Sequence, residues 1–136
     1  MQSLAGAAKV YAVAEPTDIA TIQAWQEAGA TVLDASGPSF AVKVNDAYRL
    51  TTEPWLFIVG DDVCFRPGWL EAAFKYADKF KVIGTNDLCT TRVKLGVHAT
   101  HFFIARDYID TVGASWDGPG IKKVCCVYPQ LYSGCA

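Results

Sequence analysis

The sequence predicts an α/β fold with a mostly parallel central sheet and helices on both faces. Segments with strand character alternate with amphipathic helical segments over residues 9–112, which is typical of βαβ units. The apolar run Trp55–Val59 is uninterrupted, as expected of a central strand buried on both faces. Asp61 and Asp62 follow this run closely, at the end of a strand where α/β proteins bind ligands.

The first part of the chain predicts two strands on either side of one helix. Residues 9–14 are an apolar strand candidate. Residues 16–28 predict a helix, because apolar side chains recur there at helical spacing, and Gly29 is a suitable stop. Residues 31–33 predict a short second strand that ends at Asp34.

The middle part centres on the apolar strand over residues 55–59. Before it, Ser39 is a suitable N-cap for a helix over residues 41–50. After it, Pro67 opens an apolar periodicity that predicts a helix over residues 67–76. We expect the inner face of that helix to carry Leu70, Ala73, Phe74 and Ala77.

The last part predicts strands over residues 80–83 and 101–105 and a short helix over residues 107–112. The segment 89–97 reads as irregular. Residues 121–136 break the alternation and are either an edge strand or a tail.

Length and composition indicate a globular protein of one domain. A chain of 136 residues can bury a sizeable core, and we place the domain at residues 1–120, truncated at its C-terminal end. The net charge of −2 gives no general attraction to nucleic acid or to an anionic membrane. Residues 1–62 hold three Lys/Arg against eight Asp/Glu, a net of −5, and residues 63–136 hold nine against six, a net of +3. Solvated faces of opposite sign would explain this difference.

The cysteines and the amino terminus predict a cytoplasmic protein. The first residues lack the basic start and apolar core of a signal peptide, and no apolar run reaches the roughly 18 residues of a membrane span. The five cysteines are irregularly spaced without a C-x-x-C pair, which favours reduced thiols over a disulfide framework or a zinc site.

Three central motifs carry a resemblance to a known family. Lys43-Val-Asn45, Glu53-Pro-Trp-Leu-Phe-Ile-Val-Gly-Asp-Asp-Val63 and Phe65-Arg-Pro-Gly-Trp-Leu70 together resemble the core of family 2 glycosyltransferases with the GT-A fold. The segments 100–106 and 112–117 are also similar to that family.

The resemblance covers about residues 8–120 and implies a Rossmann-like GT-A nucleotide-diphospho-sugar transferase fold. It implies transfer of a sugar from a nucleotide-diphosphate sugar donor to an acceptor hydroxyl. Short glycosyltransferase-like proteins of this kind are familiar from bacteriophages, so the resemblance also implies a phage origin and, with it, the host cytoplasm.

The same resemblance assigns a divalent cation, Mn²⁺ or Mg²⁺, to the acidic pair. A cation held by carboxylates neutralises the diphosphate as the sugar leaves. Asp62 would be the direct ligand, and Asp61 would bind sugar hydroxyls or a metal-bound water. The first Asp of the family motif falls on Gly60 here. The alternative is that the two carboxylates only form a polar turn after a strand.

Other site residues follow from the resemblance. Glu15 and Asp34 occupy positions where family members hold the base and ribose, and Lys43 would reach the diphosphate. The alternatives are helix capping for Glu15, a strand-end turn for Asp34 and a solvated lysine. His101, or His98, would complete the metal site, against the alternative of a packed or solvated histidine.

The resemblance also implies a catalytic base. Inverting enzymes need a base to deprotonate the acceptor hydroxyl, and the resemblance assigns that role to Asp117, beyond which the chain has no Asp or Glu. Three hypotheses therefore remain: a glycosyltransferase, a degenerate glycosyltransferase-like binding protein without turnover, and an unrelated α/β module. Uncovered sheet edges also make a homodimer a hypothesis to test.

Overall fold

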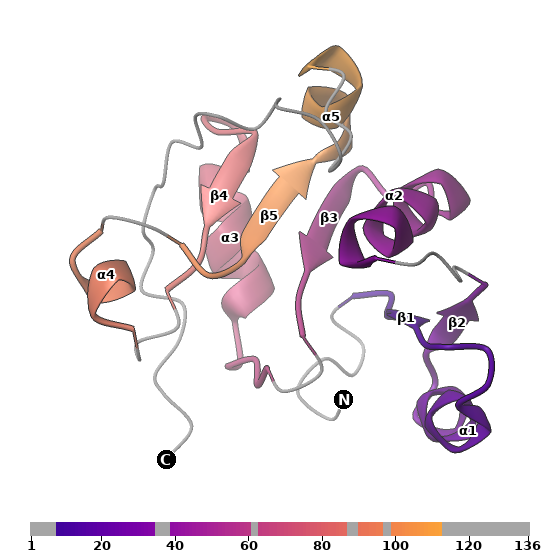
Figure 1. Ribbon diagram of the computed structural model, residues 1–136. Coiled ribbons are helices and arrows are strands. Elements are labelled where there is room, and N and C mark those ends of the chain that lie inside the picture. The colour runs from indigo at the N-terminus through magenta and orange to yellow at the C-terminus, as the bar shows by residue number, and fades with distance from the viewer. Residues whose placement is uncertain (1–7, 35–38, 61–62, 87–89, 97–98, 113–136) are drawn as a thin grey trace. The chain divides into compact units, whose positions relative to one another are not determined.

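The computed structural model describes residues 8–34, 39–60, 63–86, 90–96 and 99–112. In this described part, the chain forms two compact units that divide between Thr52 and Glu53. Both units combine helices with a small sheet (Figure 1). The predicted α/β class is therefore confirmed.

The first unit is a βαβ unit followed by a helix. Its elements are β1 (Tyr11–Val13), α1 (Ile19–Glu27), β2 (Thr31–Leu33) and α2 (Phe40–Leu50). β1 and β2 are parallel, with Tyr11 opposite Thr31 and Val13 opposite Leu33. A helix between two parallel strands is the connection that this pairing needs.

Caps set the ends of the two helices in this unit. The side chain of Asp18 accepts a hydrogen bond from Thr21 N at 3.2 Å and begins α1. Gly29, at φ 83°, follows the end of α1 in the left-handed conformation that favours glycine. The Ser39 hydroxyl accepts from Val42 N at 3.3 Å and begins α2. Ser39 and Gly29 lie at the predicted boundaries, whereas α1 begins at Ile19, after the Asp18 cap, and not at Pro16.

The second unit contains three strands and three helices in its described residues. They are β3 (Trp55–Ile58), α3 (Trp69–Ala77), β4 (Val82–Gly84), α4 (Thr91–Lys94), β5 (Phe102–Ala105) and α5 (Arg106–Val112). The strand order is β3-β5-β4, and β5 is antiparallel to both neighbours. β3 and β4 are therefore parallel to each other, and α3 connects them past the intervening β5.

The strand pairing differs from the predicted sheet. Of the three pairings between described strands, one is parallel and two are antiparallel, where a mostly parallel sheet is predicted. β5, rather than the predicted strand 55–59, lies in the middle of its sheet. An apolar run reports burial but not strand direction, because parallel and antiparallel strands can be equally apolar when both faces are covered.

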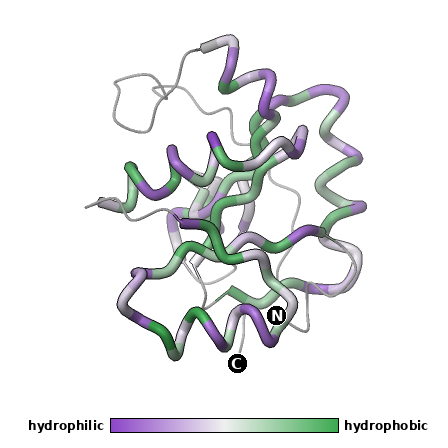
Figure 2. Tube along the Cα trace, turned by 90° about the vertical axis from the view of Figure 1, so that its right-hand side faces the viewer, coloured by the Kyte–Doolittle hydropathy of each residue, from purple (hydrophilic) through white to green (hydrophobic). Residues whose placement is uncertain are grey.

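The core of the second unit forms around β4 and β5. Ile83 is fully buried, and Phe103, Ile104 and Ala105 are at most 4% exposed. The Trp55 ring stacks on that of Phe103 with centroids 4.7 Å apart. In Figure 2 the described strands are mostly hydrophobic, whereas the helices alternate between hydrophobic and hydrophilic residues. The core of the second unit is thus built from strand residues together with buried residues of its three described helices.

The inner face of α3 includes predicted residues and adds Trp69. Ala73 is buried as predicted, and the Phe74 ring packs edge-on against that of Phe103 with centroids 5.4 Å apart, although Phe74 is 45% exposed. Trp69, which the predicted face does not include, is also buried. The helix begins at Trp69, after Gly68 at φ 79°, so its first large side chain takes the core position. Trp69 packs against Phe65 and Phe57, with ring centroids 4.6 and 5.6 Å apart.

Two further helices complete the described fold. α4 is a single turn within the segment predicted to be irregular, and its Val93 is fully buried. α5 is joined to β3 by Arg106, whose backbone N–H donates to Pro54 O at 2.8 Å. None of the helices in the described residues is long and apolar enough to cross a membrane.

Candidate functional site

The carboxyl ends of β1 and β2 form a shared edge of the first unit. Val13 and Leu33 are paired at the ends of the two parallel strands. Glu15 lies two residues beyond one end and Asp34 directly beyond the other, and both are exposed. The parallel pairing therefore brings two predicted site carboxylates to one sheet edge, where α/β proteins bind ligands.

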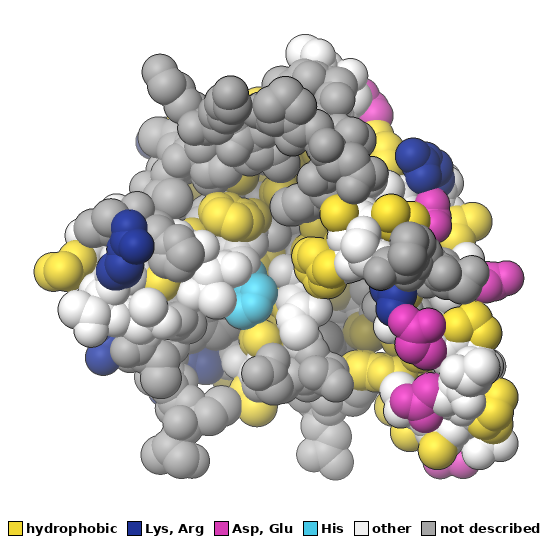
Figure 3. Space-filling model, in the orientation of Figure 1, with side chains coloured by type: hydrophobic (Ala, Val, Ile, Leu, Met, Phe, Trp, Pro, Cys, Tyr) yellow, Lys and Arg dark blue, Asp and Glu magenta, His cyan; other side chains and the backbone are white. Residues whose placement is uncertain are grey.

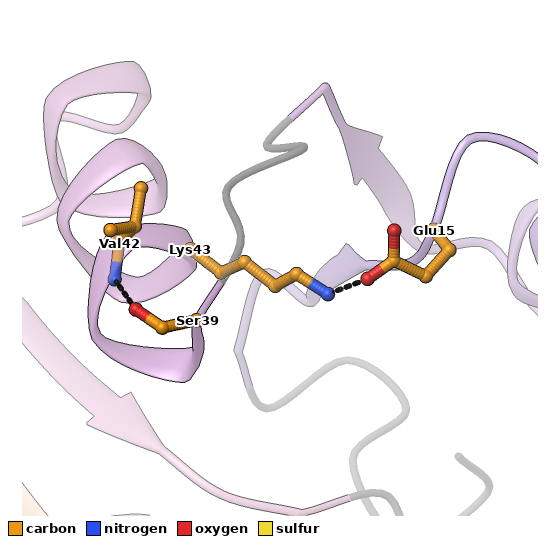
Figure 4. A network of polar contacts seen from close by, with 4 residues as sticks. All are labelled: Glu15, Ser39, Val42 and Lys43. Carbon is orange, nitrogen blue, oxygen red and sulfur yellow. Dashed lines mark hydrogen bonds and ion pairs between the residues drawn. The ribbon is translucent and has the colours of Figure 1, made fainter.

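Lys43 reaches this edge from α2. Its ammonium group forms an ion pair and hydrogen bond with the Glu15 carboxylate, as Figure 4 shows. The Lys43 side chain is 24% exposed and that of Glu15 is 58% exposed. The structure thus joins Glu15 and Lys43 directly and places Asp34 at the same edge.

The start of α2 determines the position of Lys43. Its backbone N–H donates to Ser39 O at 3.1 Å, in the turn that the Ser39 side chain caps. The next two residues, Val44 and Asn45, are only 9% and 5% exposed. Their burial anchors α2 in the first unit. A helical side chain leans toward the helix N-terminus, so the lysine extends from a fixed helix toward the loop after β1.

The helix-capping alternative for Glu15 is wrong. Asp18, not Glu15, caps α1, while the Glu15 carbonyl accepts from Asp18 N at 2.9 Å in the preceding turn. The hydrogen bonds from Thr21, side chain first and then backbone, lower the pKa of the Asp18 carboxyl. The Glu15 carboxylate is therefore used by Lys43 and not by a helix end.

Charge gathers unevenly around this edge. The acidic side chains visible in Figure 3 lie mainly over the first unit. Glu15 is neutralised by Lys43, whereas Asp34 has no ion-pair partner among the described residues. An incoming ligand therefore meets one paired and one unpaired carboxylate.

In the second unit, the predicted metal ligand His101 lies at the end of a strand. Phe102 pairs with both Ile58 and Gly84, so His101 precedes β5 at the edge where β3 and β4 end. Its carbonyl accepts from Thr85 N at 2.9 Å and from Thr85 Oγ1 at 3.1 Å. Its ring lies 6.3 Å from that of Phe57.

Several predicted site residues lie outside the described residues. They are Asp61, Asp62, His98 and Asp117. In the part of the chain that is described, no three His, Cys, Asp or Glu side chains gather as a metal site would need. The cation site and the catalytic base therefore remain predictions.

Arg106 has a structural role at the start of α5. Its Nε donates to Glu53 O at 2.8 Å, beside the backbone bond from its own N–H to Pro54 O. It therefore ties the start of α5 to the segment that leads into β3.

The sequence does not predict the buried polar residues at the end of β4. Thr85 and Asn86 are 2% and 5% exposed, directly after the strand. The Thr85 hydroxyl fixes the backbone at His101. The available signal is a Thr-Asn pair after an apolar strand, which also occurs in ordinary turns.

The chain matches no family model, no curated protein and no solved structure.

Proposed function

We propose that this protein is a GT-A-type glycosyltransferase that moves a sugar from a nucleotide-diphosphate sugar to an acceptor hydroxyl. The observation that carries the proposal is the edge of the first unit. There, Glu15 and Asp34 follow two parallel strands, and Lys43 is paired with Glu15. This supports a nucleoside site, because carboxylates accept hydrogen bonds from base N–H groups and ribose hydroxyls.

The second unit supports a donor-phosphate site by its strand register. In the sequence, Gly60, Asp61 and Asp62 come shortly after β3, and the β3–β5 pairing puts His101 beside the end of β3. In the proposal, Asp62 and His101 hold Mn²⁺ or Mg²⁺ and Asp61 binds sugar hydroxyls or a metal-bound water. The cation supplies positive charge for the diphosphate leaving group.

The transfer step needs a base for the acceptor. In the proposal, the Asp117 carboxylate removes the proton from the acceptor hydroxyl. The acceptor oxygen then bonds to the anomeric carbon, and the bond from that carbon to the diphosphate oxygen breaks. The nucleoside diphosphate leaves with the bonding electrons. Asp117 is the last Asp or Glu of the given sequence.

A degenerate binding protein is the second candidate. Residues 118–136 contain no Asp or Glu, so the assignment of the base depends on Asp117 alone among residues 113–136. In this alternative the nucleotide site binds its ligand without transfer.

The test is a thermal-shift screen of UDP, GDP, CDP, dTDP and ADP with and without Mn²⁺. Binding to the native state raises the melting temperature by mass action. We expect one nucleotide to shift wild type in the presence of Mn²⁺, and Asp62→Ala to lose that shift while its unliganded melting temperature is unchanged. Asp78→Ala, a change at an exposed aspartate after α3, is the control.

The outcomes separate the hypotheses. No shift with any nucleotide, or an undiminished shift in Asp62→Ala, would overturn the site assignment. Release of free sugar from the corresponding nucleotide-sugar, or its transfer, separates an enzyme from a degenerate binding protein. Loss of either reaction in Asp117→Asn, with binding retained, would support the assigned base.

A further inference from the structure

We infer that Lys43 is a positioning residue that acts through Glu15, not a direct contact to the donor phosphates. The inference rests on the proposed nucleotide site and assigns a different role to one of its residues. Its starting point is the ion pair between the Lys43 ammonium and the Glu15 carboxylate (Figure 4).

The two partners differ in how firmly the fold holds them. Lys43 projects from α2, beside the buried Val44 and Asn45, and its side chain is 24% exposed. Glu15 lies in the loop after β1, and its side chain is 58% exposed. An exposed glutamate on a loop has many rotamers to lose when it binds a ligand. The ion pair restricts that freedom before the ligand arrives.

The bond pattern leaves Glu15 able to bind a ligand. Lys43 donates to one oxygen of the carboxylate, Oε1. A carboxylate has two oxygens and about four lone-pair sites, so Oε2 can still accept from a base N–H or a ribose hydroxyl. Lys43 thereby orients the acceptor without occupying all of it.

The helix position of Lys43 also favours the pair. Its N–H bonds to the carbonyl of the N-cap Ser39, so it lies near the N-terminus of α2. A cation there is disfavoured by the helix dipole, and the negative charge of Glu15 offsets this cost. A phosphate contact from Lys43 would place a second anion beside the Glu15 carboxylate, and the single positive charge of the lysine would then have to offset both.

A double-mutant cycle tests the inference. We would measure the affinity of the nucleoside diphosphate selected in the thermal-shift screen for wild type, Lys43→Met, Glu15→Gln and the double variant. We expect Lys43→Met alone to weaken binding about tenfold. A loss of this size corresponds to weakening one hydrogen bond between the ligand and the charged Glu15 carboxylate. The double variant should bind no more weakly than Glu15→Gln, and Lys43→Arg should restore most of the affinity. Lys75→Met, at an exposed lysine of α3, is the control.

The matching nucleoside, without phosphates, gives an independent result. If Lys43 acts through Glu15, Lys43→Met weakens nucleoside and nucleoside diphosphate by the same factor. A loss confined to the diphosphate, an additive double variant, or no loss in Lys43→Met would each overturn the inference while leaving the nucleotide site in place. Failure of wild type to bind any nucleotide would instead overturn the proposed function and this inference together.

Discussion

A single lysine sets the charge that a ligand meets at the edge of the first unit. Because Lys43 neutralises Glu15, the edge presents the charge of Asp34 and not of two carboxylates. An anionic ligand such as a nucleoside diphosphate is repelled less by one exposed charge than by two, although salt screens both. Because the charge of Lys43 is already offset by Glu15, a diphosphate bound at this edge would need another cation to balance its own charge.

Asp34 offers a prediction at the same scale. We expect Asp34→Asn to weaken nucleotide binding about tenfold, because ribose hydroxyls bond more strongly to a charged acceptor than to an amide. The unliganded melting temperature should hardly change, since Asp34 is exposed. Isothermal titration measures the affinity, with Glu27→Gln, at the exposed end of α1, as the control. Equal affinity in Asp34→Asn and wild type would remove Asp34 from the site.

The sequence predicts which residues follow the strand ends better than it predicts side-chain contacts. The resemblance named Glu15, Asp34 and Lys43, and the parallel strands confirm that the two carboxylates share an edge. The ion pair between Glu15 and Lys43 was not predicted, because the two residues are 28 positions apart. Contacts at such separation depend on how α2 packs, which neither periodicity nor capping encodes.

For the helices and strands, local sequence signals predict where helices begin and end but not how the strands pair. The residues Ser39 and Gly29 mark helix ends through a side-chain oxygen and a positive φ, and both effects act within a few residues. The direction of β5 and the single turn of α4 depend on the rest of the fold. A short helix has little propensity signal of its own, so the sequence does not predict α4.

The cap of α1 predicts a pH dependence. Hydrogen bonds from Thr21 hold the pKa of Asp18 below its ordinary value. Its contribution to stability is therefore present above the unfolded pKa of about 3.9 and is lost as the pH falls through the lower folded value. Asp18→Asn retains a capping oxygen without titrating. We expect the variant and wild type to melt alike at neutral pH, and wild type to lose more stability on acidification.

Thermal melts from neutral pH down to about pH 3 check this expectation. The Lys81–Asp107 pair, which also lowers the pKa of an aspartate, remains in both proteins and so cancels in the comparison. Identical pH profiles for wild type and Asp18→Asn would show that the cap contributes nothing through its charge.

For the whole molecule, the two units differ in how much apolar surface they bury. The second unit contains fully buried Ile83 and Val93 and a stacked aromatic pair. In the first unit, no residue of α1 is buried and Ile19 is 57% exposed. Since burial of apolar area is the main stabilising term, stability should reside chiefly in the second unit.

Truncating one isoleucine in each unit tests this difference. We expect Ile83→Ala to lower the free energy of unfolding by about 2–5 kcal/mol, the range for a buried isoleucine. Ile19→Ala should change it by less than about 0.5 kcal/mol, as exposed positions do. Urea unfolding followed by circular dichroism measures both. Similar losses in the two variants would contradict the assignment of stability to the second unit.

The short strands of the first unit have a consequence for how the protein opens. β1 and β2 contain three residues each, and a two-stranded sheet has little stability of its own. Their amides are therefore expected to exchange with solvent through local unfolding well before those of β4 and β5. The edge that carries Glu15 and Asp34 is then intact in only part of the native ensemble. A ligand that binds this edge must first shift the population toward molecules in which β1 and β2 are folded. Its apparent affinity is therefore the intrinsic affinity multiplied by the fraction of molecules in which the edge is folded.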